Sequence, residues 1–144
     1  MTTRASASQA RDLWQLREGI SESLSATGMP HKNDVTVPVS RLPTFIDQVE
    51  KVFEHSYPGW DVCLFGHAGD GNIHPCIFYD ASKPGELERS EELGGRILER
   101  CVEVGGTITG EHGVGIEKLR QMCVQFRPAE LAAFHDVKRA FDAA

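Results

Sequence analysis

Two apolar segments on either side of the turn HAGDGN limit the possible folds of this chain more than anything else in its sequence. Residues 61–66 and 73–79 each have the length and the apolar, β-branched and aromatic content of a strand. The turn between them contains the Asp-Gly and Gly-Asn pairs that favour a β-hairpin. The sequence therefore predicts two neighbouring antiparallel strands near the middle of the chain.

The rest of the chain alternates between helical and strand-like patterns. Apolar residues at helical spacing and short β-branched runs predict helices at 9–26, 43–57, 87–102, 114–124 and 128–141, and strands at 35–39 and 107–110. From residue 35 onward the order is strand, helix, strand, strand, helix, strand, which is the split βαββαβ, or ferredoxin-like, arrangement. We therefore expect an α+β fold: an antiparallel sheet with helices on one face, an N-terminal helix and C-terminal helices.

Composition narrows the class of protein. The 144 residues suit one domain, which we place at residues 9–144, after small and polar residues 1–8 that we expect to be disordered. A net charge of −6 argues against nucleic acid or an anionic membrane surface as the main partner. The chain has neither an eighteen-residue apolar span nor the apolar core of a signal peptide near its start, so we expect a cytoplasmic location. The four cysteines form no CxxC pair and are interpreted as reduced core residues.

Four polar residues that are distant in sequence are expected to meet at one rim of the sheet. His67 and His74 flank the hairpin turn, and Glu111 and His112 follow the last predicted strand. We expect the start of the first strand, the hairpin turn and the end of the fourth strand to lie at the same rim. Two imidazoles and a carboxylate are a common ligand set for zinc and other divalent first-row ions, so His67, His74 and Glu111 are candidate metal ligands.

Other residues suit an anionic substrate or a proton transfer. Lys32 and Arg17 are candidates for holding an anion, and Ser21 lies on the same helical face as Arg17. His112 directly follows a candidate ligand, so its ring can lie beside the metal and act as a general base. The remaining histidines are interpreted as ordinary residues: His31 as solvated, and His55 and His135 as surface residues.

Four segments together resemble the C-terminal domain of the FAD-linked oxidases, the family of glycolate oxidase and of D-lactate and D-2-hydroxyglutarate dehydrogenases. These segments are WQLRE at 14–18, KNDVTVPVSRLP at 32–43, GHAGDGNIH at 66–74 and GTITGEHGVGIEK at 106–118. The resemblance extends over nearly the whole chain, from about residue 13 to residue 141.

The resemblance implies a role for each matching residue. His67, His74 and Glu111 match the metal ligands, and His112 matches the base that takes the proton of the substrate's 2-hydroxyl group. The residues that match the substrate-binding positions are Arg17, Ser21 and Lys32. The implied reaction oxidises a D-2-hydroxy acid to a 2-oxo acid with transfer of hydride to FAD, and the implied metal is zinc, with manganese or iron as alternatives.

Departures from the family pattern leave other readings open. Where relatives have HLN after the turn, this chain has HPC, so Cys76 replaces an asparagine that contacts substrate in the hydroxyglutarate enzymes. The FAD-binding domain is absent from the sequence, so we expect the isolated chain to be inactive, to need a flavin domain as partner, and to form homo-oligomers through exposed apolar surface. The alternative is a stand-alone metal- or small-ligand-binding module without catalysis.

Overall fold

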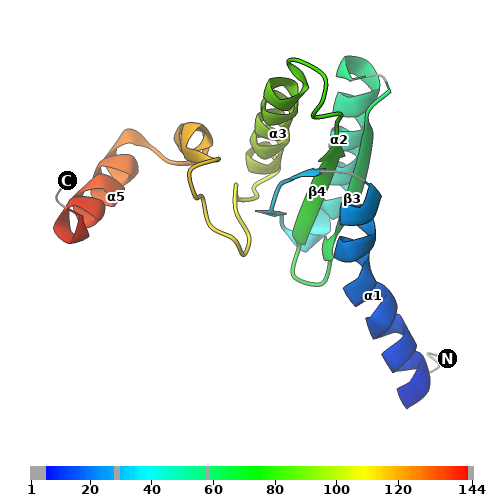
Figure 1. Ribbon diagram of the computed structural model, residues 1–144. Coiled ribbons are helices and arrows are strands. Elements are labelled where there is room, and N and C mark those ends of the chain that lie inside the picture. Colours follow the sequence, from blue (N-terminus) through cyan, green and yellow to red (C-terminus); the bar gives the residue numbers. More distant parts are fainter. Residues whose placement is uncertain (1–5, 28–29, 58, 143–144) are drawn as a thin grey trace.

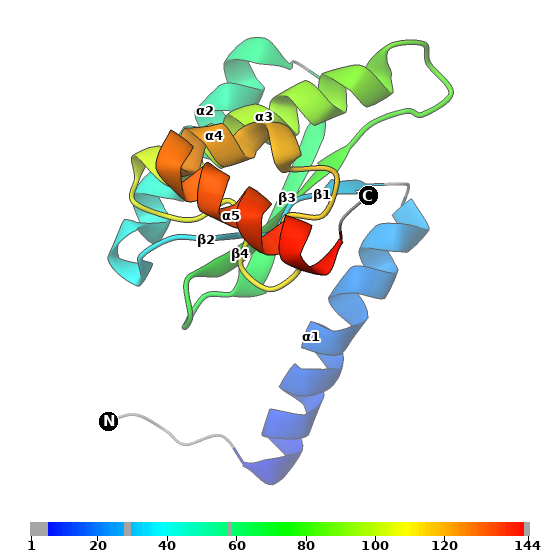
Figure 2. The ribbon, with the colours of Figure 1, turned by 90° about the vertical axis from the view of Figure 1, so that its left-hand side faces the viewer.

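The computed structural model describes residues 6–27, 30–57 and 59–142, and within them a small antiparallel sheet is combined with helices (Figures 1 and 2). In chain order the elements are α1 (Ala7–Thr27), β1 (Pro30–Lys32), β2 (Val35–Thr36), the 3-10 helix η1 (Val39–Arg41), α2 (Leu42–Ser56), β3 (Asp61–His67), β4 (Asn72–Phe78), α3 (Glu86–Glu103), the 3-10 helix η2 (Leu119–Gln121), α4 (Met122–Gln125) and α5 (Pro128–Phe141). The α+β class predicted from the sequence is confirmed.

β4 is the central strand of the sheet. β3 pairs with one edge of it along its full length, which confirms the predicted hairpin. β1 and β2 both pair with the other edge in a single register, which runs from Pro30 opposite Phe78 to Thr36 opposite Asn72. They are therefore two halves of one strand, and in Figure 2 they follow one line across the sheet.

Pro75 explains why this strand is divided. The backbone N–H of Asn33 donates to the Pro75 carbonyl over 2.9 Å, but Pro75 has no N–H with which to return the bond. The ladder therefore has a gap between β1 and β2. The predicted strand at 35–39 is wrong at its end as well, because Val39 already begins η1 and is 52% exposed.

The predicted fourth strand at 107–110 is reduced to a single bridge between Thr107 and Thr36. Beyond Thr107, backbone N–H groups donate to side chains and not to a neighbouring strand. Ile108 N–H donates to the side chain of Gln125, and Gly110 N–H donates to the side chain of Asp34. A strand cannot continue where its N–H groups are committed elsewhere.

The predicted helix at 114–124 is also wrong. Residues 115–118 form turns, and only η2 and α4 follow them. Gly113 and Gly115 both have positive φ angles, which a continuous right-handed helix does not allow. Two of the apolar residues behind the prediction, Ile116 and Leu119, lie exposed instead of packing on the core.

The two faces of the sheet have different roles. Along β4, Ile73 and Ile77 face α2 and α3 and belong to the hydrophobic core, whereas His74 and Cys76 alternate with them and face the opposite side. The core is completed by buried residues of α2 and α3, among them Phe45, Val49, Leu93, Ile97 and Leu98. This packing holds the sheet rigid and leaves its other face for polar residues.

The first and last helices extend away from this core. Figure 1 shows α1 projecting from the sheet at one side and α5 lying apart from it at the other. On α1, Leu13, Trp14 and Leu16 are 61%, 64% and 71% exposed, so its apolar stripe has almost no packing partner within the described residues. α1 begins at Ala7, inside the segment 1–8 that was expected to be disordered; residues 1–5 lie outside the described part of the chain.

Candidate functional site

The predicted site residues meet on the open face of the sheet, not at the expected rim. The sheet register shows why: Pro30 lies opposite Phe78, which is the end of β4 far from the hairpin turn. Antiparallel pairing puts the start of one strand beside the end of its neighbour, so the start of the first strand and the turn cannot share a rim. The residues still converge, because alternate positions of neighbouring strands face the same side.

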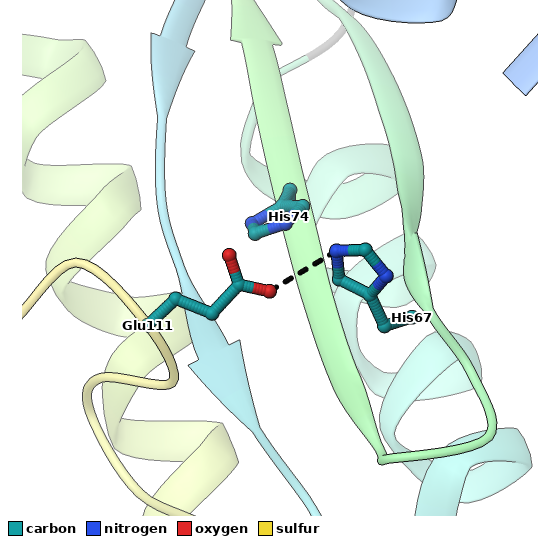
Figure 3. A group of neighbouring side chains, drawn as sticks. All are labelled: His67, His74 and Glu111. Atoms are coloured by element: carbon teal, nitrogen blue, oxygen red, sulfur yellow. Dashed lines mark ion pairs between the residues drawn. The ribbon is translucent and has the colours of Figure 1, made fainter. Parts of the chain in front are cut away.

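His67, His74 and Glu111 form a compact group with one potential ligand atom from each residue. These atoms all lie within 4.8 Å of one another. His67 and His74 come from the two strands of the hairpin, and Figure 3 shows Glu111 reaching towards them from the loop after Thr107. His67 Nε2 lies 3.1 Å from Glu111 Oε1, with both side chains about half exposed, whereas His74 is buried.

Arg17 joins this group from α1. Its Nη2 lies 3.2 Å from His67 Nε2. Because His67 Nε2 also lies 3.1 Å from Glu111 Oε1, it accepts from Arg17 in one tautomer and donates to Glu111 in the other. The guanidinium group of Arg17, the imidazole of His67 and the carboxylate of Glu111 therefore meet in one small region.

His112 and Lys32 border the group, and Ser21 does not. The His112 ring is exposed, and its centroid lies 5.8 Å from that of His74. The ammonium group of Lys32 lies over the Phe65 ring, 5.4 Å from its centroid. Ser21 is exposed on α1, and among the described residues its side chain makes no recorded contact with the group.

Burial favours the neutral form of His74. Burial lowers the pKa of His74 below its usual value, and the nearby charge of Lys32 lowers it further, against the opposing effects of Asp34 and Glu111. His74 Nδ1 is buried and has no hydrogen-bond partner within the described residues. Metal ions bind the lone pair of an imidazole nitrogen, so two imidazoles and a carboxylate within one ion's reach suit a divalent metal.

Asp34 is the main residue of the site to which the sequence had given no role. Its carboxylate is buried, and its Oδ2 accepts hydrogen bonds from the backbone N–H groups of Gly110, Glu111 and His112 over 2.9, 2.7 and 2.8 Å. Its Oδ1 accepts a bond from the Asn72 amide over 2.7 Å. Burial alone would raise the pKa of Asp34, but these donors hold it well below its usual range. The available signal was its place in the segment KNDVTVPVSRLP, directly before the β-branched run at 35–39.

Lys118 fixes the other end of the same loop. Its buried ammonium group donates to the backbone carbonyls of Asp34 and Ile108 over 2.8 and 2.9 Å. Burial lowers the pKa of Lys118, while the charges of Asp34 and Glu117 oppose that effect. Two buried ionic side chains of opposite sign thus hold the loop that carries Glu111 and His112.

The other histidines do not belong to this group. His31 is not solvated, as had been expected, but lies half-buried on the helix side of the sheet, where a Cβ on Gly94 of α3 would come within 2.7 Å of His31 Nε2. Burial lowers the pKa of His31, against the charges of Glu117 and Glu91, and Lys118 lowers it slightly more. His135 is exposed on α5, and the side chain of His55 lies outside the described residues.

The cysteines fit the prediction of free thiols, but only two of the four are buried. Cys76 and Cys101 are buried, Cys63 is partly exposed opposite Cys76 on β3, and Cys123 is exposed. Burial raises the pKa of Cys76 to about 11 and that of Cys101 to about 12.

A cavity of about 320 Å³ adjoins the candidate metal ligands. Lys32, Asp34 and His112 line it together with the loop from Gly113 to Lys118. It therefore offers a cation and an exposed imidazole to a small molecule.

The chain is similar to one family throughout and to several characterised enzymes. The family model "FAD linked oxidases, C-terminal domain" matches residues 1–144. Glycolate oxidase subunit GlcD of Escherichia coli is 50% identical over 111 residues, 76% of this chain and 21% of the relative. D-2-hydroxyglutarate dehydrogenase of Stutzerimonas stutzeri is 35% identical over 140 residues, 93% of this chain and 29% of the relative. A mitochondrial D-lactate dehydrogenase [cytochrome] of Arabidopsis thaliana is 30% identical over 136 residues, 92% and 24% of the two chains.

The chain thus spans less than a third of the length of these relatives. Within the part that the structure describes, no helix combines the length and the apolar character needed to cross a membrane.

Proposed function

Since this chain belongs to the family of C-terminal domains of FAD linked oxidases, we propose that it is the metal-bearing substrate domain of an FAD-dependent 2-hydroxyacid dehydrogenase. The observation that carries the proposal is the meeting of His67, His74 and Glu111 with Arg17 on one polar face of the sheet. A metal site bordered by cationic side chains suits a small organic anion. FAD, bound mainly by a part of the enzyme outside this chain, would accept the two electrons removed from the substrate.

His67, His74 and Glu111 are the residues proposed to hold the metal. They provide two imidazole nitrogens and one carboxylate oxygen, and three protein ligands leave coordination positions for a substrate, as in catalytic zinc sites. Zinc is the first candidate, with manganese and iron as alternatives that accept the same donors. A divalent ion bound there would lower the pKa of a coordinated hydroxyl group.

The substrate carboxylate is proposed to bind Arg17 and Lys32. Arg17 lies within contact distance of His67, and Lys32 lines the cavity beside His112. A guanidinium group can hold a carboxylate through two parallel hydrogen bonds, and the ammonium group adds a second positive charge. Ser21, one turn of α1 beyond Arg17, is proposed to contact substrate on family grounds alone.

His112 is proposed to be the general base. Its exposed ring borders the cavity and the metal-binding group, so it can reach a hydroxyl group held there. In the oxidation, the 2-hydroxyl proton would pass to His112, while the C2 hydrogen and its electron pair leave in the direction of the cofactor. The product is the 2-oxo acid.

The exposed apolar side chains of α1 are consistent with a domain that packs against the rest of an enzyme. Leu13, Trp14 and Leu16 together present large apolar surface beside Arg17. We propose that the flavin-binding part covers this surface. In the isolated chain it should promote self-association, which light scattering over a range of concentrations can detect.

Metal analysis of the purified chain tests the first part of this proposal. After removal of any tag histidines and loading with zinc or manganese, we expect about one equivalent of metal in the parent chain and none after His67→Ala combined with His74→Ala. His135→Ala is the matched control, because His135 is an exposed histidine on α5, outside the group. Equal metal in the double variant and the parent would contradict the assignment.

Turnover in the flavin-containing enzyme tests the second part. In that enzyme, His112→Ala should lower kcat by roughly 10²–10⁴-fold, the usual contribution of a general base. Metal content should remain unchanged, because His112 is not one of the proposed ligands. Unaltered turnover would refute the role of His112 without affecting the metal assignment.

A further inference from the structure

We propose that Asp34 is the positioning residue of this metal site: one buried carboxylate fixes both the loop that carries Glu111 and the ring orientation of His74. The inference rests on the proposed function in so far as it concerns metal binding. It adds a residue that is neither one of the proposed metal ligands nor one of the proposed substrate-binding residues. Asp34 lies in the gap between β1 and β2, directly opposite His74 of β4 in the sheet register.

The first half of the inference concerns the loop. Three consecutive backbone N–H groups, those of Gly110, Glu111 and His112, point at the single oxygen Oδ2 of Asp34. Consecutive N–H groups converging on one anion fix the backbone angles of the segment that supplies them. The Cα of Glu111 is therefore held relative to the sheet, although the Glu111 side chain itself is exposed.

The second half concerns His74. Its Nδ1 lies 3.6 Å from Asp34 Oδ1, and Nδ1 has no hydrogen-bond partner within the described residues. A small closing movement would let Nδ1–H donate to this oxygen. A proton on Nδ1 leaves the lone pair on Nε2, and a carboxylate commonly fixes the tautomer of a metal-binding histidine in this way.

The donors around Asp34 require a carboxylate and not an amide. Oδ2 receives three N–H groups, and Oδ1 receives the Asn72 amide and faces His74. An asparagine at position 34 would have to turn its NH₂ group towards one of these two sets of donors. Asp34→Asn preserves the shape of the side chain while removing an acceptor, so it is the informative change.

The test compares zinc affinity in the metal-free parent chain, Asp34→Asn and a matched control, Asp61→Asn. Asp61 is an exposed carboxylate at the end of β3 far from His67. By titration calorimetry with zinc alone, we expect Asp34→Asn to bind about 10–100-fold more weakly than the parent, the usual effect of removing such a supporting group. Asp61→Asn should bind like the parent. Circular dichroism confirms that each variant is folded.

A folded Asp34→Asn chain with parental zinc affinity would overturn the inference, because a residue that merely stabilises the fold would behave in that way. Nitrogen NMR of the zinc-loaded parent provides a second test that needs no variant: His74 should carry its proton on Nδ1 and coordinate through Nε2. Coordination through Nδ1 would also overturn the inference.

If the parent chain binds no zinc, the proposed metal function fails, and the inference is decided on the metal-free protein. The amide protons of residues 110–112 should then be shifted downfield and protected from exchange, as expected for donors to a buried carboxylate. Unshifted and unprotected amides at these positions would refute the positioning role.

Discussion

Replacing Lys118 with methionine should destabilise the chain more than replacing any exposed lysine. The ammonium group of Lys118 is buried, 7% of the residue being exposed, and it donates to the carbonyls of Asp34 and Ile108. Methionine has a similar volume, so the change opens little cavity. It removes both hydrogen bonds and leaves two buried acceptors without their donor.

The magnitude follows from these two bonds. A hydrogen bond to a charged group stabilises a protein by about 1.5–3 kcal/mol, and two of them would give about 3–6 kcal/mol. Part of this is offset, because the ammonium group no longer has to be desolvated, a cost that also lowers the pKa of Lys118. We expect a net loss of about 2–4 kcal/mol in the free energy of unfolding.

Urea unfolding followed by circular dichroism measures the loss. With a urea m-value of about 2 kcal/mol per M, the midpoint should fall by roughly 1–2 M. Lys83→Met is the control, because Lys83 is exposed and its ion pairs with Asp80 and Glu86 are surface pairs worth about 0–1 kcal/mol. If Lys118→Met shifted the midpoint no more than Lys83→Met, the two bonds would not stabilise the loop as reasoned.

Three further predictions follow from other parts of the fold. Gly110→Ala should cost about 1–3 kcal/mol in urea unfolding, since its Cβ would lie 1.9 Å from Asn72 Nδ2; parental stability would contradict the close approach. The unfolding free energy should fall as pH drops below about 6.5, because burial lowers the pKa of folded His31 and the unfolded chain then binds more protons. His31→Gln should reduce this slope, by at most about 1.4 kcal/mol per pH unit; an unchanged slope would refute the assignment. A thiol reagent at pH 8 should modify exposed Cys123 first and leave Cys76, whose pKa is about 11, unmodified until unfolding, as mass spectrometry of peptides would show.

The sequence was sufficient to predict those helices and strands that form because an apolar face is buried. The hairpin of β3 and β4 and the helices α2 and α3 follow directly from apolar periodicity, because their apolar faces meet in one core. The same periodicity led to the wrong prediction of a helix at residues 114–124. Ile116 and Leu119 are exposed there, and polar contacts such as that of Lys118 determine the path of the backbone. The predicted fourth strand is wrong for a similar reason, because backbone N–H groups beyond Thr107 donate to side chains and not to a neighbouring strand.

The grouping of the candidate metal ligands was predictable from the sequence, but its location in the fold was not. His67, His74 and Glu111 were identified from residue type and motif, and the structure brings them together. Their place on a face of the sheet depends on the antiparallel register. The sequence-based prediction put the start of the first strand beside the hairpin turn, whereas the register puts it at the opposite end of β4. Asp34 was missed because its role appears only once the register sets it opposite His74.

One strand residue holds the loop of the site at both ends. The carboxylate of Asp34 binds the backbone of residues 110–112, and its carbonyl oxygen accepts the ammonium group of Lys118. Of its apolar residues, Val114 is only partly buried against the core and Ile116 is 87% exposed. The loop is therefore fixed to the sheet mainly by directional polar bonds, which hold a backbone more tightly in position than non-directional apolar contacts do. That property suits a segment that holds the Glu111 carboxylate within 4.8 Å of nitrogen atoms of two histidines on a different part of the fold.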